Sequence, residues 1–223
     1  MTLAKAVVAW SSGKDCAYAL EEIRRSRTYD IVGLLTTLTR PYSRVSMHGV
    51  REELLARQAE ALALPVERVE IPAPCPNEVY EREMAGALAR LRARDVEAVI
   101  FGDLFLQDIR DYREARMAGS GLLPVFPLWG RPTGALARSM LRDGLQASVV
   151  CVDPRKLPAR FAGREFDEDF LADLPSTVDP CGENGEFHTF VHHLPSFRSP
   201  VAFTRGVVVE REGFVFADVV PAE

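Results

Sequence analysis

A short polar segment near the start of the chain has the residue types of a phosphate-binding loop. It follows the apolar run at residues 4–10, precedes a helical pattern, and reads Ser11, Ser12, Gly13, Lys14 and Asp15. Unpaired N–H groups at a helix N-terminus bind phosphate oxygens, and small side chains let the backbone approach them. Lys14 adds a positive charge for a polyphosphate, and Asp15 is a candidate Mg²⁺ ligand. The alternative is a turn that caps a helix, with both charges in solvent.

This segment differs from a Walker A loop, because it has one glycine and its lysine is followed by aspartate. Its spacing resembles the PP-loop of the ATP pyrophosphatase superfamily, written SGGxDS, which implies cleavage of ATP between the α and β phosphates. Ser12 stands at the first glycine of that pattern and Cys16 at its final serine. If residue 12 adopts a positive φ, a serine there carries backbone strain.

A second cluster of chemically active side chains lies near the other end of the chain. Within the stretch GENGEFHT are Glu183, Glu186, His188 and Thr189, interrupted by two glycines that bend the backbone. Carboxylate and imidazole groups in one loop can orient a nucleophile, hold a metal or accept a proton from an incoming amine. The alternative is a surface turn with exposed charges and a partly buried histidine.

The elements that must position these residues alternate between short apolar runs and longer amphipathic stretches. We expect strands at residues 4–10, 31–37, 66–71, 98–101 and 147–152, and helices at 16–27, 77–94, 107–118 and 133–141. A further helix has Leu55, Ala59 and Leu62 on its inner face and ends before Pro65. This order predicts an α/β fold, Rossmann-like, with a mostly parallel sheet and helices on both faces. After residue 153 a short acidic helix and a terminal hairpin predict a small α+β lobe. The expected domains are 1–153 for ATP binding and 154–223 for the acceptor.

Composition excludes several classes of protein. The chain of 223 residues is 47% hydrophobic and 26% charged, typical of a globular protein, and its net charge of −5 offers no general attraction for nucleic acid. Four widely spaced cysteines fit a reducing, cytoplasmic environment. No apolar run is long enough for a membrane span, and the first one is too short for a signal peptide.

Taken together, the motifs resemble the diphthine–ammonia ligase family, also called ATP-binding domain 4. That family's late motif reads GExGE[YF]HT and is matched at every fixed position from Gly182 to Thr189. Additional matches are Gly102-Asp103 after the fourth strand, Met47-His48, Arg113-Glu114 and Pro127-Leu128-Trp129. The resemblance implies a fold of the adenine nucleotide alpha hydrolase type.

The resemblance also implies a reaction and assigns roles to residues. ATP adenylates a carboxylate, pyrophosphate leaves, and ammonia attacks the acyl-adenylate to release the amide and AMP. The implied ATP-binding residues are Ser11, Ser12, Gly13, Lys14, Asp15, His48, Gly102 and Asp103, with Mg²⁺ at Asp15. The implied catalytic residues are Lys14, Asp15, Glu186 and His188. The implied substrate-binding residues are Glu183, Glu186, His188, Thr189, Arg113 and Glu114.

Three alternatives stay open at this point. The acceptor carboxylate is either diphthine on a translation factor or another carboxylate, such as a small molecule in a bacterium. A tRNA-modifying PP-loop enzyme is disfavoured, because the sequence has no CxxC pair and no basic tract. A sensor that binds ATP or AMP without turnover is compatible with the same motifs, because fold does not fix function. A homodimer is neither indicated nor excluded.

Overall fold

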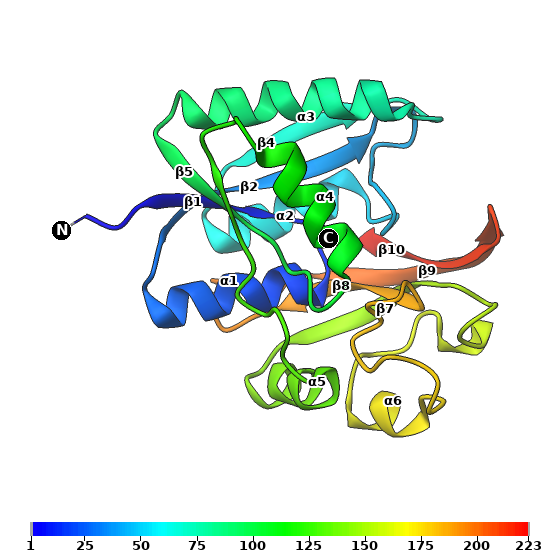
Figure 1. Cartoon of the computed structure of the whole chain (residues 1–223). Helices are drawn as coiled ribbons and strands as arrows, with labels where there is room; N and C mark the ends of the chain where they lie inside the picture. Colours follow the sequence, from blue (N-terminus) through cyan, green and yellow to red (C-terminus); the bar gives the residue numbers. More distant parts are fainter. Residues whose placement is uncertain (1, 223) are drawn as a thin grey trace.

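The computed structural model describes residues 2–222, which form two β-sheets with helices around them (Figure 1). The strands of the first sheet are β1 (Lys5–Ala9), β2 (Asp30–Thr39), β3 (Arg44–Val45), β4 (Val66–Ile71), β5 (Val96–Ile100) and β6 (Leu123–Val125). The helices that accompany them are α1 (Lys14–Ser26), α2 (Glu52–Leu62), α3 (Asn77–Arg92) and α4 (Gln107–Met117).

The first sheet is parallel except for β3, so the predicted Rossmann-like α/β fold is confirmed. Strand β2 pairs with β1 along one edge and with β4 along the other, and β1 pairs with β5, which pairs with β6. The short β3 pairs antiparallel with the last residues of β2, beyond the end of β1. The chain therefore winds outward from β1 in both directions. Ligands of such sheets bind where the winding reverses, outside the carboxyl ends of the central strands.

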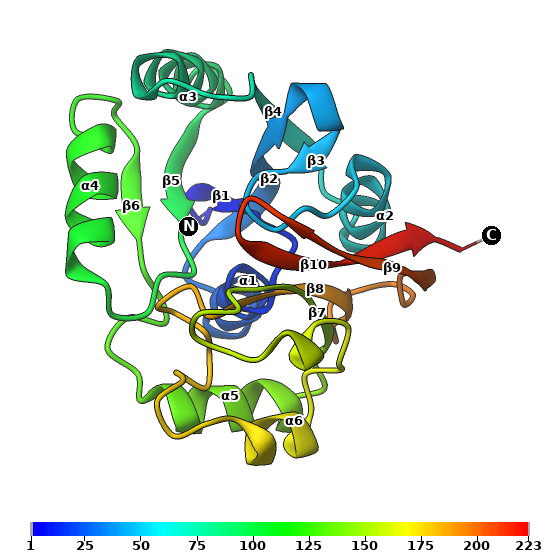
Figure 2. The same cartoon turned by 90° about the vertical axis from the view of Figure 1, so that its right-hand side faces the viewer.

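Helices cover both faces of this sheet (Figure 2). On one face α3 buries Ala87, Leu88 and Leu91 against Val7 and Val99 of the central strands. These inward positions recur at helical spacing, which is why the segment forms an amphipathic helix. Helices α1 and α2 belong to the second, larger apolar cluster on the other face.

The second sheet is antiparallel and lies beyond α1. Its strands are β7 (Gln146–Val152), β8 (Phe187–His193), β9 (Phe203–Arg211) and β10 (Phe214–Pro221), in the order β8-β7-β10-β9. Helices α5 (Thr133–Arg142) and α6 (Glu168–Asp173) lie on the side away from α1 (Figure 2). The predicted terminal hairpin is confirmed, since β9 and β10 join through Glu212-Gly213, both with positive φ.

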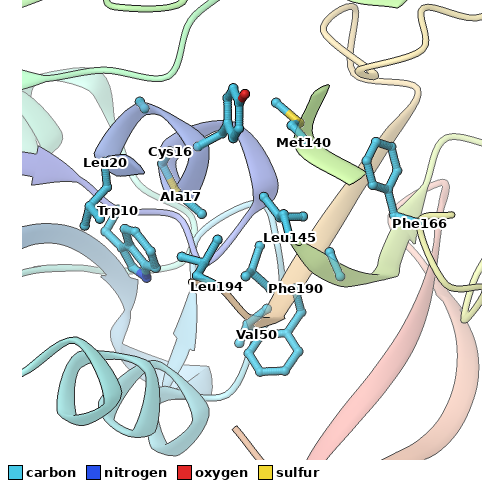
Figure 3. Packing of buried hydrophobic residues seen from close by; sticks show 14 of the residues in the cluster. Trp10, Cys16, Ala17, Leu20, Val50, Met140, Leu145, Phe166, Phe190 and Leu194 are labelled. Carbon is cyan, nitrogen blue, oxygen red and sulfur yellow. The ribbon is translucent and has the colours of Figure 1, made fainter. Parts of the chain in front are cut away.

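One apolar cluster connects the two sheets through α1. Trp10 and Leu20 belong to the same buried cluster as Leu145, Phe190 and Leu194 of the C-terminal half (Figure 3). Strand β7, which precedes the predicted domain boundary at residue 153, pairs with β8 and β10 beyond it. The two-domain division stays a prediction.

The structure corrects several local expectations. Strand β8 occupies a stretch that was expected to be a loop, and the short strands β3 and β6 were not expected. Helix α5 begins at the predicted Thr133 but ends at Arg142, one residue later than expected. Within residues 2–222, no helix is long and apolar enough to cross a lipid bilayer.

Candidate functional site

The loop between β1 and α1 has the backbone of a tight anion-binding turn. Ser12 is fully buried with a φ of +71°, and Gly13 is the N-cap of α1 without any side chain to cap it. Gly102, at the end of β5, packs directly on this turn, since a Cβ there would lie 2.6 Å from the Cys16 backbone nitrogen. Only glycine allows this approach, so the end of β5 and the start of α1 are held together.

The late motif, Gly182 to Thr189, contacts this loop directly. Thr189 Oγ1 accepts a hydrogen bond from the Lys14 backbone N–H at 3.0 Å, although the two residues are 175 positions apart. The Val191 backbone N–H donates to the Ser12 carbonyl at 2.9 Å. The fully buried Gln58 of α2 donates to both the Ser12 and the Val191 carbonyl oxygens, at 3.2 and 2.6 Å. Gln58 was not singled out from sequence, because a glutamine inside an amphipathic helix carries no motif.

The Lys14 side chain is buried between the two motifs rather than exposed beside the loop. It is 2% exposed, its Nζ donates to Asp15 Oδ2 at 2.9 Å, and it also donates to the Cys181 carbonyl oxygen. The ring of Phe187 lies 5.1 Å from the same nitrogen. Burial is the largest single influence and lowers the Lys14 pKa, but Asp15, Cys181 and Glu183 together outweigh it and the net pKa is raised. The ammonium therefore stays charged and connects α1 to the late motif.

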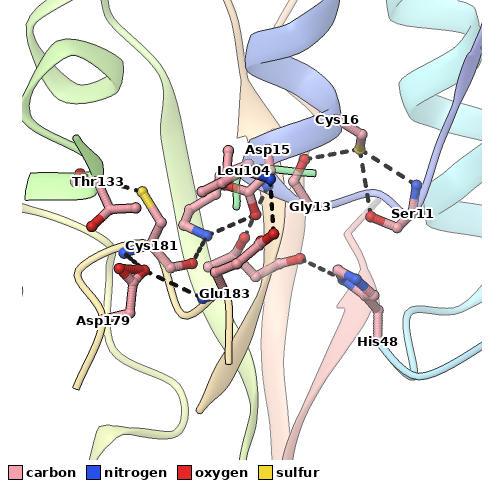
Figure 4. A network of polar contacts seen from close by, with 12 residues as sticks. Ser11, Gly13, Asp15, Cys16, His48, Leu104, Thr133, Asp179, Cys181 and Glu183 are labelled. Atoms are coloured by element: carbon pink, nitrogen blue, oxygen red, sulfur yellow. Dashed lines mark hydrogen bonds and ion pairs between the residues drawn. The ribbon is translucent and has the colours of Figure 1, made fainter. Parts of the chain in front are cut away.

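Four carboxylates from three segments, Asp15, Asp103, Asp179 and Glu183, influence one another's protonation. Figure 4 shows Asp15, Asp179 and Glu183. Burial raises the pKa of Asp15 despite its pairing with Lys14, and Asp179 and Asp103 raise it further. Burial likewise raises the pKa of Glu183 to about 7, with Asp15 and Asp103 contributing. The Asp15 Oδ1 atom is buried and has no hydrogen-bond partner within the described part of the chain.

Glu183 connects the late motif to the end of β5. Its Oε1 atom accepts the Leu104 backbone N–H at 2.8 Å, directly after Gly102-Asp103. Asp103 in turn forms an ion pair with Arg113 of α4, with Nε and Oδ2 2.7 Å apart. The neighbouring Glu114 is exposed and pairs with Arg110 at 2.7 Å. Arg113 thus joins the site, whereas Glu114 does not.

His48 and His188 lie side by side, next to Gly13 of the β1–α1 loop. Their ring centroids are 4.6 Å apart, and His48 Nδ1 lies 3.2 Å from the Thr189 carbonyl oxygen, to which it donates. His48 also packs on Gly13, where a Cβ would lie 2.7 Å from its Cε1 atom. Burial lowers the pKa of His188 to about 4 and that of His48 well below its usual range. Both imidazoles are therefore neutral near pH 7.

Glu186 lies inside the late motif and organises its turn. It is 3% exposed, and its Oε1 atom accepts the Asp179 backbone N–H at 3.0 Å and the Asn184 side-chain amide at 3.1 Å. Its carbonyl oxygen accepts the Asp153 N–H at 2.9 Å. These contacts order the backbone that presents Glu183 and His188.

A carboxylate outside the motifs secures the turn that carries His48. Asp218 of β10 accepts hydrogen bonds from Arg44 at 2.9 Å and from Arg51 at 2.5 Å. Arg44 and Arg51 form an isolated antiparallel bridge at the base of this turn, and Arg44 also donates to the Gly49 carbonyl at 2.6 Å. Sequence reasoning missed Asp218, because its partners are more than 160 positions away.

Two cavities open on this constellation. The smaller, of about 430 Å³, lies at the carboxyl ends of the first sheet and is lined by Ser11, Thr37, Phe101 and Arg113 among others. The larger, of about 800 Å³, contains both His48 and His188 in its lining. Among residues 2–222, no three His, Cys, Asp or Glu side chains are grouped closely enough to hold a metal ion by themselves.

Comparison with known proteins decides the family. Residues 4–122 match the family model described as the diphthamide synthase N-terminal domain, and residues 133–215 match that of the diphthamide synthase C-terminal domain. The chain belongs to the diphthamide synthase family. The first match covers the parallel sheet up to the start of β6, and the second runs from the start of α5 into β10.

Curated relatives carry one name. The chain is 29% identical over 180 residues to the diphthine–ammonia ligases of Bos taurus and Homo sapiens, which covers 72% of this chain and 66% of theirs. It is 28% identical over 177 residues to the diphthine–ammonia ligase of Schizosaccharomyces pombe, covering 73% of this chain and 29% of that protein. The aligned part thus spans less than two thirds of these relatives' length.

Proposed function

We propose that this chain is an ATP-dependent ligase that amidates the carboxylate of diphthine with ammonia, as the names of its relatives suggest. In this reaction the acceptor carboxylate attacks the α-phosphorus of ATP, pyrophosphate leaves, and ammonia then displaces AMP to form the amide. One observation carries the proposal: the late motif is hydrogen-bonded to the start of α1 through Thr189 and Lys14, so both motifs face one reaction centre.

We propose that the nucleotide binds beside the carboxyl ends of the central strands. The N–H groups in the first turn of α1 that follow Lys14, whose own N–H donates to Thr189, would bind the phosphates, since a helix N-terminus carries partial positive charge. The cavity of about 430 Å³ beside Ser11 would hold the adenosine, with Arg113 at its edge. Its size is within the range of small-molecule sites.

Asp15 is our candidate ligand for Mg²⁺. Its buried Oδ1 atom has no protein partner among the described residues, which fits a cation held jointly by one carboxylate and substrate phosphates. Bound Mg²⁺ would neutralise charge on the phosphates.

Glu183 is our candidate for the proton acceptor in the amidation step. Ammonia attacks only as the neutral base, so a group near it must take up the proton that is released when the C–N bond forms. A pKa of about 7 suits this task near neutral pH, whereas His188, with a pKa of about 4, is a weaker base. In this proposal Glu186 and Thr189 position the motif, and His188 faces the acceptor.

The test is stoichiometric. Purified protein receives ATP, Mg²⁺, ammonia and a diphthine-bearing acceptor, and AMP, pyrophosphate and amide are quantified with each component omitted in turn. A ligase forms the amide and AMP in equal amounts only in the complete mixture. A sensor gives no AMP, and a ligase for a different acceptor gives none with diphthine, so either result overturns the proposal.

A matched pair of variants checks the loop assignment. Asp15→Ala should abolish AMP formation while the protein remains folded, because it removes the unpaired carboxylate beside the phosphates. Asp108→Ala is the control, since Asp108 also lies in the first turn of a helix, α4, but is exposed. Equal activity in both variants would remove Asp15 from the mechanism.

A further inference from the structure

The larger cavity is floored by one face of the second sheet. His188 of β8 pairs with Cys151 of β7, Cys151 pairs with Phe216 of β10, and Phe216 pairs with Val209 of β9. All four residues line the cavity of about 800 Å³. Cross-strand partners share a face of the sheet, so they form a continuous row from the late motif to the edge strand. Neighbouring strands are about 4.8 Å apart, so this row is roughly 14 Å long.

One end of this row adjoins the phosphate loop. His188 contacts His48, and His48 packs against Gly13 at the start of α1. The turn that carries His48 separates the two cavities, since Val45, Ser46 and Met47 line both of them. The His48–His188 end of the larger cavity is therefore the end that lies beside the start of α1.

The chemistry of the lining changes along the row. Around β9 and β10 the side chains are mainly apolar, including Val207, Val209, Phe214 and Phe216. The Asp218 carboxylate, which also lines the cavity, is paired with two arginines. At the inner end, the neutral His188 imidazole has one N–H that can donate a hydrogen bond to an anionic oxygen, whereas the N–H of His48 is already donated to the Thr189 carbonyl oxygen.

We propose that the larger cavity is the acceptor site and that it takes an elongated, mostly apolar group ending in a carboxylate. The carboxylate lies at the His48–His188 end, and the rest of the group extends over Phe216 to Val209. This inference rests on the proposed ligase function, because it assumes that a carboxylate must meet the α-phosphorus. Beyond the ligase function, the inference names the cavity that binds the acceptor and the β-sheet surface that selects it.

The test uses two neighbouring valines of β9. Val209→Arg places a charged side chain in the apolar part of the cavity and should weaken binding of a diphthine-bearing acceptor by roughly tenfold or more. Val208→Arg is the control, because Val208 is 58% exposed and does not line the cavity; its effect should stay within about twofold. Val207→Arg, at an exposed residue that does line the cavity, repeats the test independently.

Acceptor binding and ATP binding are measured separately by calorimetry, alongside AMP release and thermal unfolding. The inference predicts that Val209→Arg and Val207→Arg weaken only acceptor binding. If both variants bind acceptor like the wild type while the wild type makes amide, the cavity assignment is wrong and the ligase proposal stands. If the wild type binds acceptor in this cavity without making AMP, the ligase proposal fails alone. A wild type that does not bind acceptor overturns both.

Discussion

Thr189 caps helix α1 from a strand of the other sheet, with its Oγ1 atom 3.0 Å from the backbone nitrogen of Lys14. The N-cap residue itself, Gly13, has no side chain that could do so. The start of α1, where we propose that the phosphates bind, is therefore ordered by the late motif. Folding of the second sheet and ordering of the start of α1 are coupled through this contact.

Thr189→Val should lower the free energy of unfolding by about 1 kcal/mol, because it leaves the buried Lys14 N–H without its acceptor. Urea denaturation measures this change. Thr189→Ser keeps the hydroxyl and should retain more of the stability than valine does. Equal losses in the two variants would mean that the hydrogen bond contributes little.

Ser12→Gly should raise the free energy of unfolding by about 1 kcal/mol, because Ser12 has a φ of +71°, a conformation that glycine adopts without strain. The buried Ser12 hydroxyl has no partner among the described residues, so its removal breaks no hydrogen bond. Thermal unfolding is the measurement. The control is Ser11→Gly, since Ser11 is not among the residues with positive φ; a stabilised Ser11→Gly variant would contradict the strain argument.

Glu183 should give the amidation rate a pH dependence with a midpoint near 7, measured at constant free ammonia. The rate should rise as the carboxyl loses its proton, and Glu183→Gln should lack this step. Because the folded pKa of about 7 exceeds the ordinary 4.5, ionisation of Glu183 costs stability as pH rises between these values. Glu183→Gln should therefore be stabilised relative to wild type at pH 8 more than at pH 4, and the opposite order would reject the assignment.

Burial of His188 should destabilise the protein at acidic pH, whereas burial of Glu183 destabilises it as pH rises. Its folded pKa of about 4 lies below the ordinary 6.5, so the unfolded chain binds the proton first and stability falls as pH drops from about 6.5 to 4. His188→Gln should reduce this acid sensitivity. Denaturant melts at pH 7 and pH 4.5 measure it. If the imidazole resonance of His188 titrates above pH 6 in the folded protein, its ring is not buried and neutral.

Asp218→Asn should impair the reaction by loosening the His48 turn, which Asp218 positions through Arg44 and Arg51. We expect a lower kcat and a higher KM for the acceptor, with less change in the KM for ATP. Asp218→Glu tests whether a longer carboxylate restores the turn. Equal effects on the KM values for ATP and acceptor would indicate general loss of structure instead.

The local periodicity of the sequence was sufficient to predict most of the parallel sheet. Strand β4 begins and ends at the predicted residues, and α3 (Asn77–Arg92) lies within the helix predicted at 77–94. Neighbouring residues determine these elements, because the spacing of apolar side chains along one segment selects a helix or a strand. Likewise, the late motif was identified from its residues alone.

Strand β8 shows where local reasoning failed. Its residues Phe187 to His193 follow a glycine-rich turn and include three histidines, so no apolar alternation marks them as a strand. The segment is extended because β7 supplies its hydrogen bonds, and β7 is distant in sequence.

The sequence by itself determined which chemistry the chain carries: a polar loop ahead of a helix, and a late cluster of acids, histidine and threonine. Only the tertiary structure decided what each group does. It buried Lys14 between the motifs, directed Glu183 to the backbone after β5, left Glu114 in solvent, and placed His188 beside His48. Protonation, burial and contact depend on neighbours that are distant in sequence, and folding alone brings those neighbours together.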